Sequence, residues 1–435
     1  MRRSLTILAS LIAIALSSSA FGQTAPLSPE ASDPLVIGWM QGSPVPDDRK
    51  IEFADGGHYT FPKTRWSFSH LREFAPTRNI WRGADRPTKL RTRLDSDIDD
   101  VMFTPLGGGD PMSWAESLAV NYTDSILVLH KGRVVYERYL GVAAPEKPHI
   151  SFSVTKSYFG TMAAMLAHDG KLDTSKNITE YLPELAGTAF ENATVQQALD
   201  MTTGIAYSED YTDPNAEVFK FAYSGGFLPA PQDYEGPQSY HDFLKTLKPE
   251  GQHGAAYSYE SVNTEVIGWI IHRITGAPPE QMLSERIWQK IGAEQDAYIM
   301  VDSQGTGFAA GGLNTTLRDH ARFGEMMRRG GRYNGRQIVP KAIIEDIRAG
   351  GDKDLFSQAG YKTLPNWSYR NQWWVSHNDH GAFSARGIHG QTIYIDPKAE
   401  MVIVRFASHP LAGNANFDPT SLPAYRAVAE HLMDK

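Results

Sequence analysis

Ser153-Val154-Thr155-Lys156 places a potential nucleophile and a potential base three residues apart at the start of an apolar, helix-like stretch. Residues i and i+3 of a helix lie on the same face, so the Lys156 amine can reach the Ser153 hydroxyl. Burial lowers the pKa of a lysine and makes it a usable base near neutral pH. A neutral amine activates a neighbouring serine for attack on a carbonyl, and N–H groups at a helix N-terminus suit the resulting oxyanion. This spacing therefore predicts acyl-transfer chemistry.

The same tetrad has a second interpretation, in which Ser153 caps the helix and Lys156 is a solvated residue of its first turn. Chance matches to Ser-x-x-Lys are common in a chain of 435 residues, so the spacing alone does not distinguish the two interpretations. Other segments of the chain favour the catalytic one.

A tyrosine-rich segment, Tyr257-Ser258-Tyr259-Glu260-Ser261-Val262-Asn263, leads directly into another apolar helix. A tyrosine beside a Ser–Lys pair can exchange a proton with the lysine and relay it to a leaving group. We assign this function to Tyr259 and expect Tyr257 to pack within the surrounding lobe.

A glycine-flanked segment, Gly387-Ile388-His389-Gly390, opens a predicted strand near the end of the chain. Glycines on an inner strand let a substrate backbone lie close, and a free N–H there can face the nucleophile. This segment is therefore a candidate substrate-binding edge. For the His389 side chain, a structural hydrogen bond to a neighbouring loop is the preferred interpretation.

The elements that must position these residues are strands at both ends of the chain and helices between them. Two hairpins are predicted from paired β-rich runs, 125–130 with 133–139 and 392–395 with 401–406. The helix after Ser153 is expected to end at Asp169-Gly170. Further helices are expected at 195–201, 264–274, 279–291, 317–328 and 423–433.

This order of elements predicts a sheet assembled from distant segments. We expect an α/β (α+β) fold in which an antiparallel sheet is flanked by helices and carries an inserted helical lobe at about 171–330. The active site is expected in the cleft between the two parts. The main domain is expected at 111–435, and residues 23–110, rich in Pro, Gly and Asp, are expected to form an irregular arm packed on it.

The composition excludes several classes of partner. A formal net charge of −8 leaves no basic stripe of the kind that binds nucleic acid. No His-Glu-x-x-His motif is present and the chain has no cysteines, so we expect neither a metal nor an organic cofactor. No Gly-x-Ser-x-Gly elbow is present either, which argues against an α/β-hydrolase.

The first 22 residues predict a secretory signal peptide. Arg2 and Arg3 precede an apolar run from Leu5 to Leu16, and small residues then lead to Gln23. The run is too short for a stable membrane anchor, so cleavage after Gly22 is expected. The mature protein is expected to be periplasmic or secreted by a bacterial cell, and an uncut N-terminal anchor is the alternative.

Together these segments resemble the superfamily of serine β-lactamases and penicillin-binding proteins, whose first motif is Ser-x-x-Lys. The resemblance is closest to the branch that holds class C β-lactamases, related esterases and 6-aminohexanoate-dimer (nylon oligomer) hydrolases. It implies a β-lactamase/transpeptidase-like fold over most of the chain. It rests on Ser153-Val154-Thr155-Lys156-Ser157, Asp200-Met201, Tyr207-Ser208-Glu209-Asp210-Tyr211, Gln372-Trp373-Trp374 and Gly387-Ile388-His389-Gly390-Gln391.

The resemblance implies a role for each matching position. Ser153 is expected to be the acylated nucleophile, Lys156 its base and Tyr259 the proton relay. The backbone N–H groups of Ser153 and Ile388 are expected to form the oxyanion hole. The other expected substrate contacts are Tyr211 as a mobile lid, Phe227 at a position that is aromatic in relatives, His389, Gly390, and Trp374, which either lines the cleft or packs a loop.

Two positions depart from the patterns of these families. The Lys-Thr-Gly motif, whose lysine attracts a substrate carboxylate, falls here on Ala385-Arg386-Gly387. The asparagine that precedes paired glycines in the nylon-dimer hydrolases is Ala310 here, which offers no side-chain hydrogen bond to a substrate amide. Both departures predict a preference for esters over linear amides, with β-lactams last.

We therefore expect an exported serine hydrolase, a carboxylesterase or an amidohydrolase acting on linear amides, whose partner is a small-molecule ester or amide. The alternative within the family is a β-lactamase or a D-alanyl-D-alanine carboxypeptidase. The alternative from another class is a penicillin-binding-type sensor that acylates once and does not turn over. The sequence predicts no particular oligomeric state.

Overall fold

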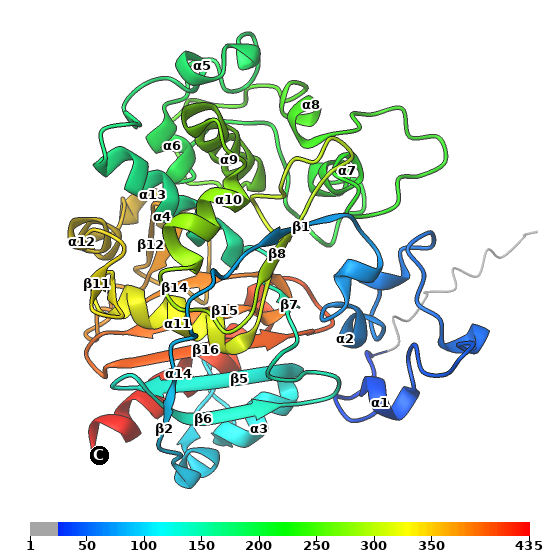
Figure 1. Cartoon of the computed structure of the whole chain (residues 1–435), viewed down its shortest axis with the longest axis vertical. Coiled ribbons are helices and arrows are strands. Elements are labelled where there is room, and N and C mark those ends of the chain that lie inside the picture. The colour runs from blue at the N-terminus through cyan, green and yellow to red at the C-terminus, as the bar shows by residue number, and fades with distance from the viewer. Residues whose placement is uncertain (1–24) are drawn as a thin grey trace, which may run out of the picture.

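The computed structural model describes residues 25–435 of the chain (Figure 1). The predicted signal peptide at residues 1–22 lies outside the described residues. Among the described helices, none is long and apolar enough to cross a membrane.

An eight-stranded sheet forms the centre of the molecule and is built from segments far apart in the chain. Every neighbouring pair of its strands is antiparallel except β2 and β6, which are parallel. This arrangement confirms the expected sheet assembled from distant segments. In spatial order the strands are β12 (Ser368–Arg370), β13 (Trp373–Val375), β14 (Phe383–Arg386), β15 (Thr392–Asp396), β16 (Met401–Ala407), β5 (Thr123–His130), β6 (Arg133–Tyr139) and β2 (Arg91–Thr92).

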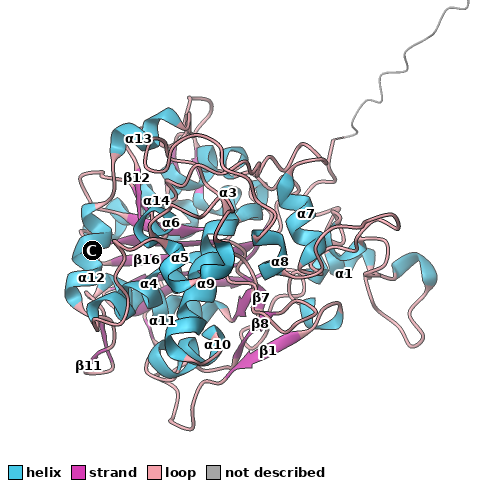
Figure 2. Ribbon diagram, turned by 90° about the horizontal axis from the view of Figure 1, so that it is seen from above, coloured by secondary structure: helices cyan, strands magenta, loops and turns pink. Residues whose placement is uncertain are grey.

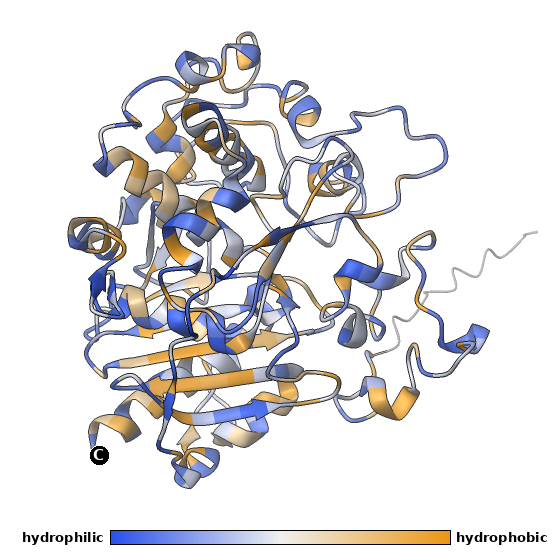
Figure 3. Ribbon diagram, viewed as in Figure 1, coloured by the Kyte–Doolittle hydropathy of each residue, from blue (hydrophilic) through white to orange (hydrophobic). Residues whose placement is uncertain are grey.

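Both predicted hairpins are confirmed, because β5 pairs with β6 and β15 pairs with β16. Strand β5 is buried along its whole length, and alternate residues face two different hydrophobic cores. Leu127 and Leu129 belong to the core on one side, and Ile126 and Val128 to the core on the other. The central strands are accordingly among the most apolar parts of the ribbon (Figure 3).

Helices cover both faces of this sheet. On one face, α11 (Leu317–Arg328) packs on β15, β16 and β5. Gly324 permits this close contact, since a Cβ atom there would lie 2.7 Å from a side-chain carbon of Val402. On the other face lie α3 (Trp114–Val120) and the last helix, α14 (Asp418–Met433).

The middle of the chain is mainly helical, and there α9 (Ser261–Thr275) packs against α4 (Val154–His168), which precedes the expected lobe at about 171–330. Most of the predicted helices are confirmed within a few residues, namely the helix after Ser153 and those at 195–201, 264–274, 317–328 and 423–433. The segment 279–291 differs, because its α-helix is short and is followed by a π-helical turn at Ser284–Trp288. Within the segment expected to form the lobe, α11 covers the large sheet, and the other helices are α5 (Ile178–Tyr181), α6 (Val195–Leu199), α7 (Glu217–Ser224), α8 (Tyr240–Leu244), α9 and α10 (Pro279–Leu283). Two further helices, α12 (Lys341–Ala349) and α13 (Lys353–Gln358), lie beside strands β12 and β13.

A second, four-stranded sheet was not predicted. Its strands are two to four residues long, too short for an alternating pattern to mark them in the sequence. It also draws on the N-terminal segment and on the region expected to be helical. In spatial order its strands are β1 (Thr77–Ile80), β8 (Ala297–Met300), β9 (Leu313–Thr315) and β7 (His149–Ile150).

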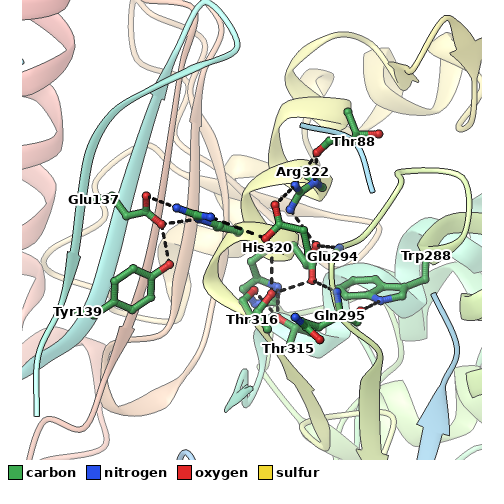
Figure 4. Close-up of polar contacts among 12 residues, drawn as sticks. Thr88, Glu137, Tyr139, Trp288, Glu294, Gln295, Thr315, Thr316, His320 and Arg322 are labelled. Atoms are coloured by element: carbon green, nitrogen blue, oxygen red, sulfur yellow. Dashed lines mark hydrogen bonds and ion pairs between the residues drawn. The ribbon is translucent and has the colours of Figure 1, made fainter. Parts of the chain in front are cut away.

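The N-terminal segment contains the short helices α1 (Pro34–Ile37) and α2 (Thr64–Ser67) and gives one strand to each of the two larger sheets. Its later part is tied to the body by Arg322 of α11, which donates to the Thr88 carbonyl and pairs with Glu294 (Figure 4). Both views place α1 on the same side of the molecule as α7 (Figures 1 and 2). The segment thus supplies strands to the fold as well as packing on its surface.

Two small hairpins complete the structure, β3 (Met102–Phe103) with β4 (Met112–Ser113) and β10 (Arg332–Tyr333) with β11 (Arg336–Gln337).

Candidate active site

Ser153 lies at the N-cap of α4, and its hydroxyl contacts the lysine predicted to activate it. The Lys156 Nζ lies 2.8 Å from the Ser153 Oγ. Only 8% of Ser153 and 1% of Lys156 are exposed. Lys156 is therefore not the solvated first-turn residue of the alternative interpretation, and the pair has the geometry of a nucleophile and its base.

The surroundings of Lys156 favour its neutral form. Burial lowers the pKa of the amine to about 8, although the negative charges of Glu209 and Glu265 oppose this shift. The Nζ also donates to the Ala310 carbonyl at 2.8 Å. Ala310 is itself held by Glu265 of α9, whose Oε1 accepts from the Ala310 N–H at 2.7 Å. These contacts fix the amine beside the serine, and the pKa of about 8 makes its neutral form more accessible near neutral pH than that of an exposed lysine.

Tyr259 lies next to the pair, just before α9. The Lys156 Nζ is 5.1 Å from the centre of its ring. Burial raises the pKa of the Tyr259 phenol well above its usual value, and an interaction with the Ser153 side chain only partly opposes this. The phenol therefore carries its proton at neutral pH and is available as a donor. Tyr257, by contrast, is buried among aromatic rings, including Phe356 and Tyr369, as its predicted packing role requires.

The glycine-flanked segment reaches the nucleophile from the end of β14. A Cβ atom on Gly387 would lie 2.8 Å from the Ser151 carbonyl and 3.1 Å from the Ser153 nitrogen, so only glycine fits this approach. Among the described residues, no acceptor receives the backbone N–H of Ser153 or of the neighbouring Ile388. Two free donors are thus positioned beside the serine, as an oxyanion hole requires.

His389 and Gly390 lie behind this edge and line neither cavity next to Ser153. Burial lowers the pKa of His389 to about 4, so the ring is neutral. Its Nδ1 donates to the His409 carbonyl at 2.7 Å, and its Nε2 accepts from the Tyr59 hydroxyl at 3.2 Å. The preferred structural interpretation of His389 agrees with these bonds, whereas direct substrate contact does not.

Two cavities of different character open on either side of Ser153. The narrower, of about 50 Å³, is lined mainly by apolar side chains, among them Phe227, Phe308 and Ala310. The wider, of about 390 Å³, is lined by Tyr259, Trp374 and several polar groups. Ser153, Tyr211 and Ile388 line both. The structure thus places Phe227 and Ala310 on one side of the nucleophile and Trp374 on the other.

Tyr211 lies at the boundary between the cavities. Its hydroxyl donates to the Glu209 Oε1 at 2.8 Å, and Glu209 also accepts from the backbone N–H of Ser261 at 2.6 Å and from its hydroxyl at 2.8 Å. Glu209 therefore anchors the loop that carries Tyr211 to the start of α9. That Tyr211 acts as a mobile lid stays a prediction.

The segment that matches the Lys-Thr-Gly motif places Ala385 and Arg386 in different surroundings. Ala385 is fully buried in the core. Arg386 lines the wider cavity, where it pairs with Asp418. Its guanidinium also lies over the Trp374 ring, with a separation of 5.3 Å from the ring centre. The charge at this edge is thus largely compensated by an internal partner.

Several residues of the site were not assigned from the sequence. Glu209 lies within a stretch that carries the family resemblance, so that stretch was the available signal. Glu265 is a carboxylate on an otherwise apolar helix face, which marks it as unusual but gives it no role. Tyr59, which lines the narrow cavity, comes from a segment with no recognisable motif. In the described part of the chain, no cluster of His, Cys, Asp and Glu could hold a metal.

Comparisons with known proteins agree with this geometry. The 6-aminohexanoate-dimer hydrolase of Paenarthrobacter ureafaciens is 38% identical over 351 residues, which are 80% of this chain and 86% of that protein. A solved structure described as a "Putative 6-aminohexanoate-dimer hydrolase from Bacillus anthracis" is 34% identical, with a TM-score of 0.81 over 90% of this chain and 99% of that one. A family VIII carboxylesterase shares the fold at 15% identity, with a TM-score of 0.54 over 79% of this chain and 100% of that one.

The beta-lactamase family model matches residues 118–420, a range that includes Ser153, Lys156, Tyr259 and Ile388. This match and the two relatives above 30% identity confirm the resemblance found in the sequence. The chain belongs to the beta-lactamase family and is a serine hydrolase.

Proposed function

We propose that this enzyme hydrolyses esters and small linear amides through an acyl-enzyme on Ser153. The observation that carries the proposal is the buried contact of 2.8 Å between the Lys156 Nζ and the Ser153 Oγ, with the pKa of that amine lowered to about 8. A serine in contact with a partly neutral, immobile amine is an activated nucleophile.

In the proposed first half-reaction, the Ser153 Oγ forms a bond to the acyl carbon while its proton passes to the neutral Lys156 amine. The oxyanion accepts hydrogen bonds from the N–H groups of Ser153 and Ile388. The bond to the leaving group then breaks, and that group takes a proton delivered through Tyr259. In the second half-reaction a water molecule loses a proton to the same groups and attacks the acyl carbon, and Ser153 regains its proton as the acid departs.

The substrate class follows from the walls of the site and from the relatives. A relative named as a 6-aminohexanoate-dimer hydrolase supports activity on linear amides. The Ala310 side chain lines the narrow cavity without a polar atom, and the buried Ala385 offers no charge to a β-lactam carboxylate. We therefore propose that activated esters react fastest, linear amides more slowly and β-lactams last.

We further propose that the enzyme works in the periplasm or outside the cell after removal of residues 1–22. The basis is the basic, apolar and small-residue order of that segment. N-terminal sequencing of protein recovered from its host is expected to begin near Gln23. An intact N-terminus on a membrane fraction would contradict this.

Labelling with a fluorophosphonate tests the acyl-enzyme. The adduct is expected on the peptide that contains Ser153 and is expected to be absent in Ser153→Ala. Turnover of a p-nitrophenyl ester, a chromogenic cephalosporin and the linear aminohexanoate dimer by the same preparation then distinguishes the alternatives. A preferred cephalosporin would identify a β-lactamase, and release of a single equivalent of product would identify a sensor. Labelling at another residue would disprove the assignment of Ser153.

A further inference from the structure

The position of Tyr259 indicates which cavity receives which half of the substrate. Tyr259 lines the wider cavity and does not line the narrow one. Under the proposed function it protonates the leaving group, so the leaving group must lie on its side of Ser153. The acyl group then occupies the narrow cavity.

The narrow cavity suits a short acyl chain without charge. None of the described residues that line it is charged, and an ammonium or carboxylate buried there would lack a partner. Its volume of about 50 Å³ holds roughly four water-sized groups, because each needs on the order of 10–15 Å³ of such space. We therefore expect acyl chains much longer than butanoyl to fit this cavity poorly.

One wall of this cavity comes from the N-terminal segment. Tyr59 belongs to a 3-10 turn at Gly57–Tyr59, and its ring meets Phe227 edge-on with 5.3 Å between ring centres. Another part of the lining comes from α7, through residues that include Val218, Phe221 and Ala222. In Figures 1 and 2, α1 of the N-terminal segment lies on the same side of the body as α7.

Two hydrogen bonds hold this wall in place. The Tyr59 hydroxyl donates to the Nε2 of His389 at 3.2 Å. The neighbouring His58 donates through its Nε2 to the Phe227 carbonyl at 2.8 Å, and its ring stacks on Phe53 with 4.9 Å between ring centres. The Tyr59 ring is thus fastened both to the edge that carries Ile388 and to the loop after α7.

We propose that Tyr59 sets the acyl specificity of this hydrolase, closing the narrow cavity so that it accepts short, uncharged acyl groups. This inference rests on the proposed function. It assigns the N-terminal segment a part in substrate selection that the residues of the catalytic centre do not supply.

A series of p-nitrophenyl esters from acetyl to decanoyl, which share one leaving group, tests the proposal. The wild-type kcat/KM is expected to fall beyond butanoyl. In Tyr59→Ala the ratio of octanoyl to butanoyl kcat/KM is expected to rise at least tenfold, because each additional buried methylene is worth roughly fourfold. An unchanged ratio in folded Tyr59→Ala would overturn the proposal.

Two matched controls separate the ring from general loosening of the segment. Tyr59→Phe keeps the ring and removes only the bond to His389, so its chain-length ratio is expected to stay within about twofold of wild type. Phe61→Ala removes a nearby ring that packs on Tyr122 with 5.5 Å between ring centres and lines neither cavity. A tenfold shift in Phe61→Ala would overturn the assignment to Tyr59.

An opposite substitution keeps the test decisive if Tyr59→Ala does not fold. Ala222→Leu places a larger side chain in the same cavity and is expected to shift the preference from butanoyl toward acetyl; no shift would overturn the proposal.

A 6-aminohexanoyl ester is expected to react at least tenfold more slowly than the hexanoyl ester, and the reverse order would overturn the preference for uncharged groups. Failure of the proposed function looks different, because Ser153→Ala would then keep the wild-type ester activity.

Discussion

The catalytic centre and the walls of the two cavities are built in different ways. Ser153 and Lys156 lie three residues apart on one helix, and their contact of 2.8 Å follows from helix geometry. The walls combine segments from Tyr59 near the start of the chain to Asp418 near its end. A change in the centre is expected to alter turnover for every substrate, whereas a change in a wall is expected to alter which substrate is preferred.

The largest expected effect tests the centre itself. Lys156→Met keeps an unbranched side chain and removes the amine, so Ser153 loses its base. We expect kcat/KM to fall by roughly 10³-fold or more for esters and amides alike. A melting temperature close to that of the wild type is expected to show that the variant folds. A loss confined to one substrate class would mean that Lys156 acts as part of a wall.

Tyr259 is expected to act with Lys156 as one proton-transfer unit. Tyr259→Phe keeps the ring near the amine and removes the hydroxyl, and we expect a loss of roughly 10²-fold or more. The double variant with Lys156→Met is expected to lose little beyond the larger single effect. Steady-state kinetics of the four proteins measures the coupling, and fully additive losses would show that the two residues act independently.

The pH dependence is expected to follow the pKa of Lys156, lowered to about 8 by burial. Only the neutral amine accepts the serine proton, so kcat/KM should rise about tenfold per pH unit on the acid side and level off above the pKa. A rate that stays flat from mildly acidic to mildly alkaline pH would contradict this mechanism.

The charge of Glu209 gives that pH profile a sharper test. Its negative charge stabilises the ammonium and raises the pKa of Lys156, so Glu209→Gln is expected to move the acid limb to lower pH. Glu217 bonds to the same loop, accepting from the Ser208 N–H at 3.2 Å, but is not among the charges that shift the Lys156 pKa. Glu217→Gln is therefore the matched control, expected to leave the limb in place.

The smallest expected effect concerns a wall residue. Ala310→Asn introduces a side-chain amide at the narrow cavity, where one net hydrogen bond is worth about 1 kcal/mol, roughly fivefold in rate. With acetyl as the acyl group, we expect hydrolysis of a p-nitroanilide to gain relative to that of the p-nitrophenyl ester. Ala310→Leu matches the size without the hydrogen bond and is expected to show no such gain. Equal changes in both substrates would refute this account of specificity.

The long elements of the fold could be predicted from the sequence because their residues repeat with the period of the structure. The helix after Ser153, the helix Leu317–Arg328 and the two hairpins are examples. The strands of the second sheet, such as β7 and β9, could not be predicted. They are too short to carry a period, and they are strands only because distant partners supply their hydrogen bonds.

The sequence by itself determined that Ser153 and Lys156 lie close together, because a spacing of three residues at the start of a helix places both on one face. Only the tertiary structure decided that Lys156 is buried beside Glu209 and Glu265, that the Ile388 N–H lies free at the same edge, and that Tyr59 lines the narrow cavity. Burial, charge and cavity shape arise from contacts between distant segments. Local spacing in a sequence does not encode such contacts.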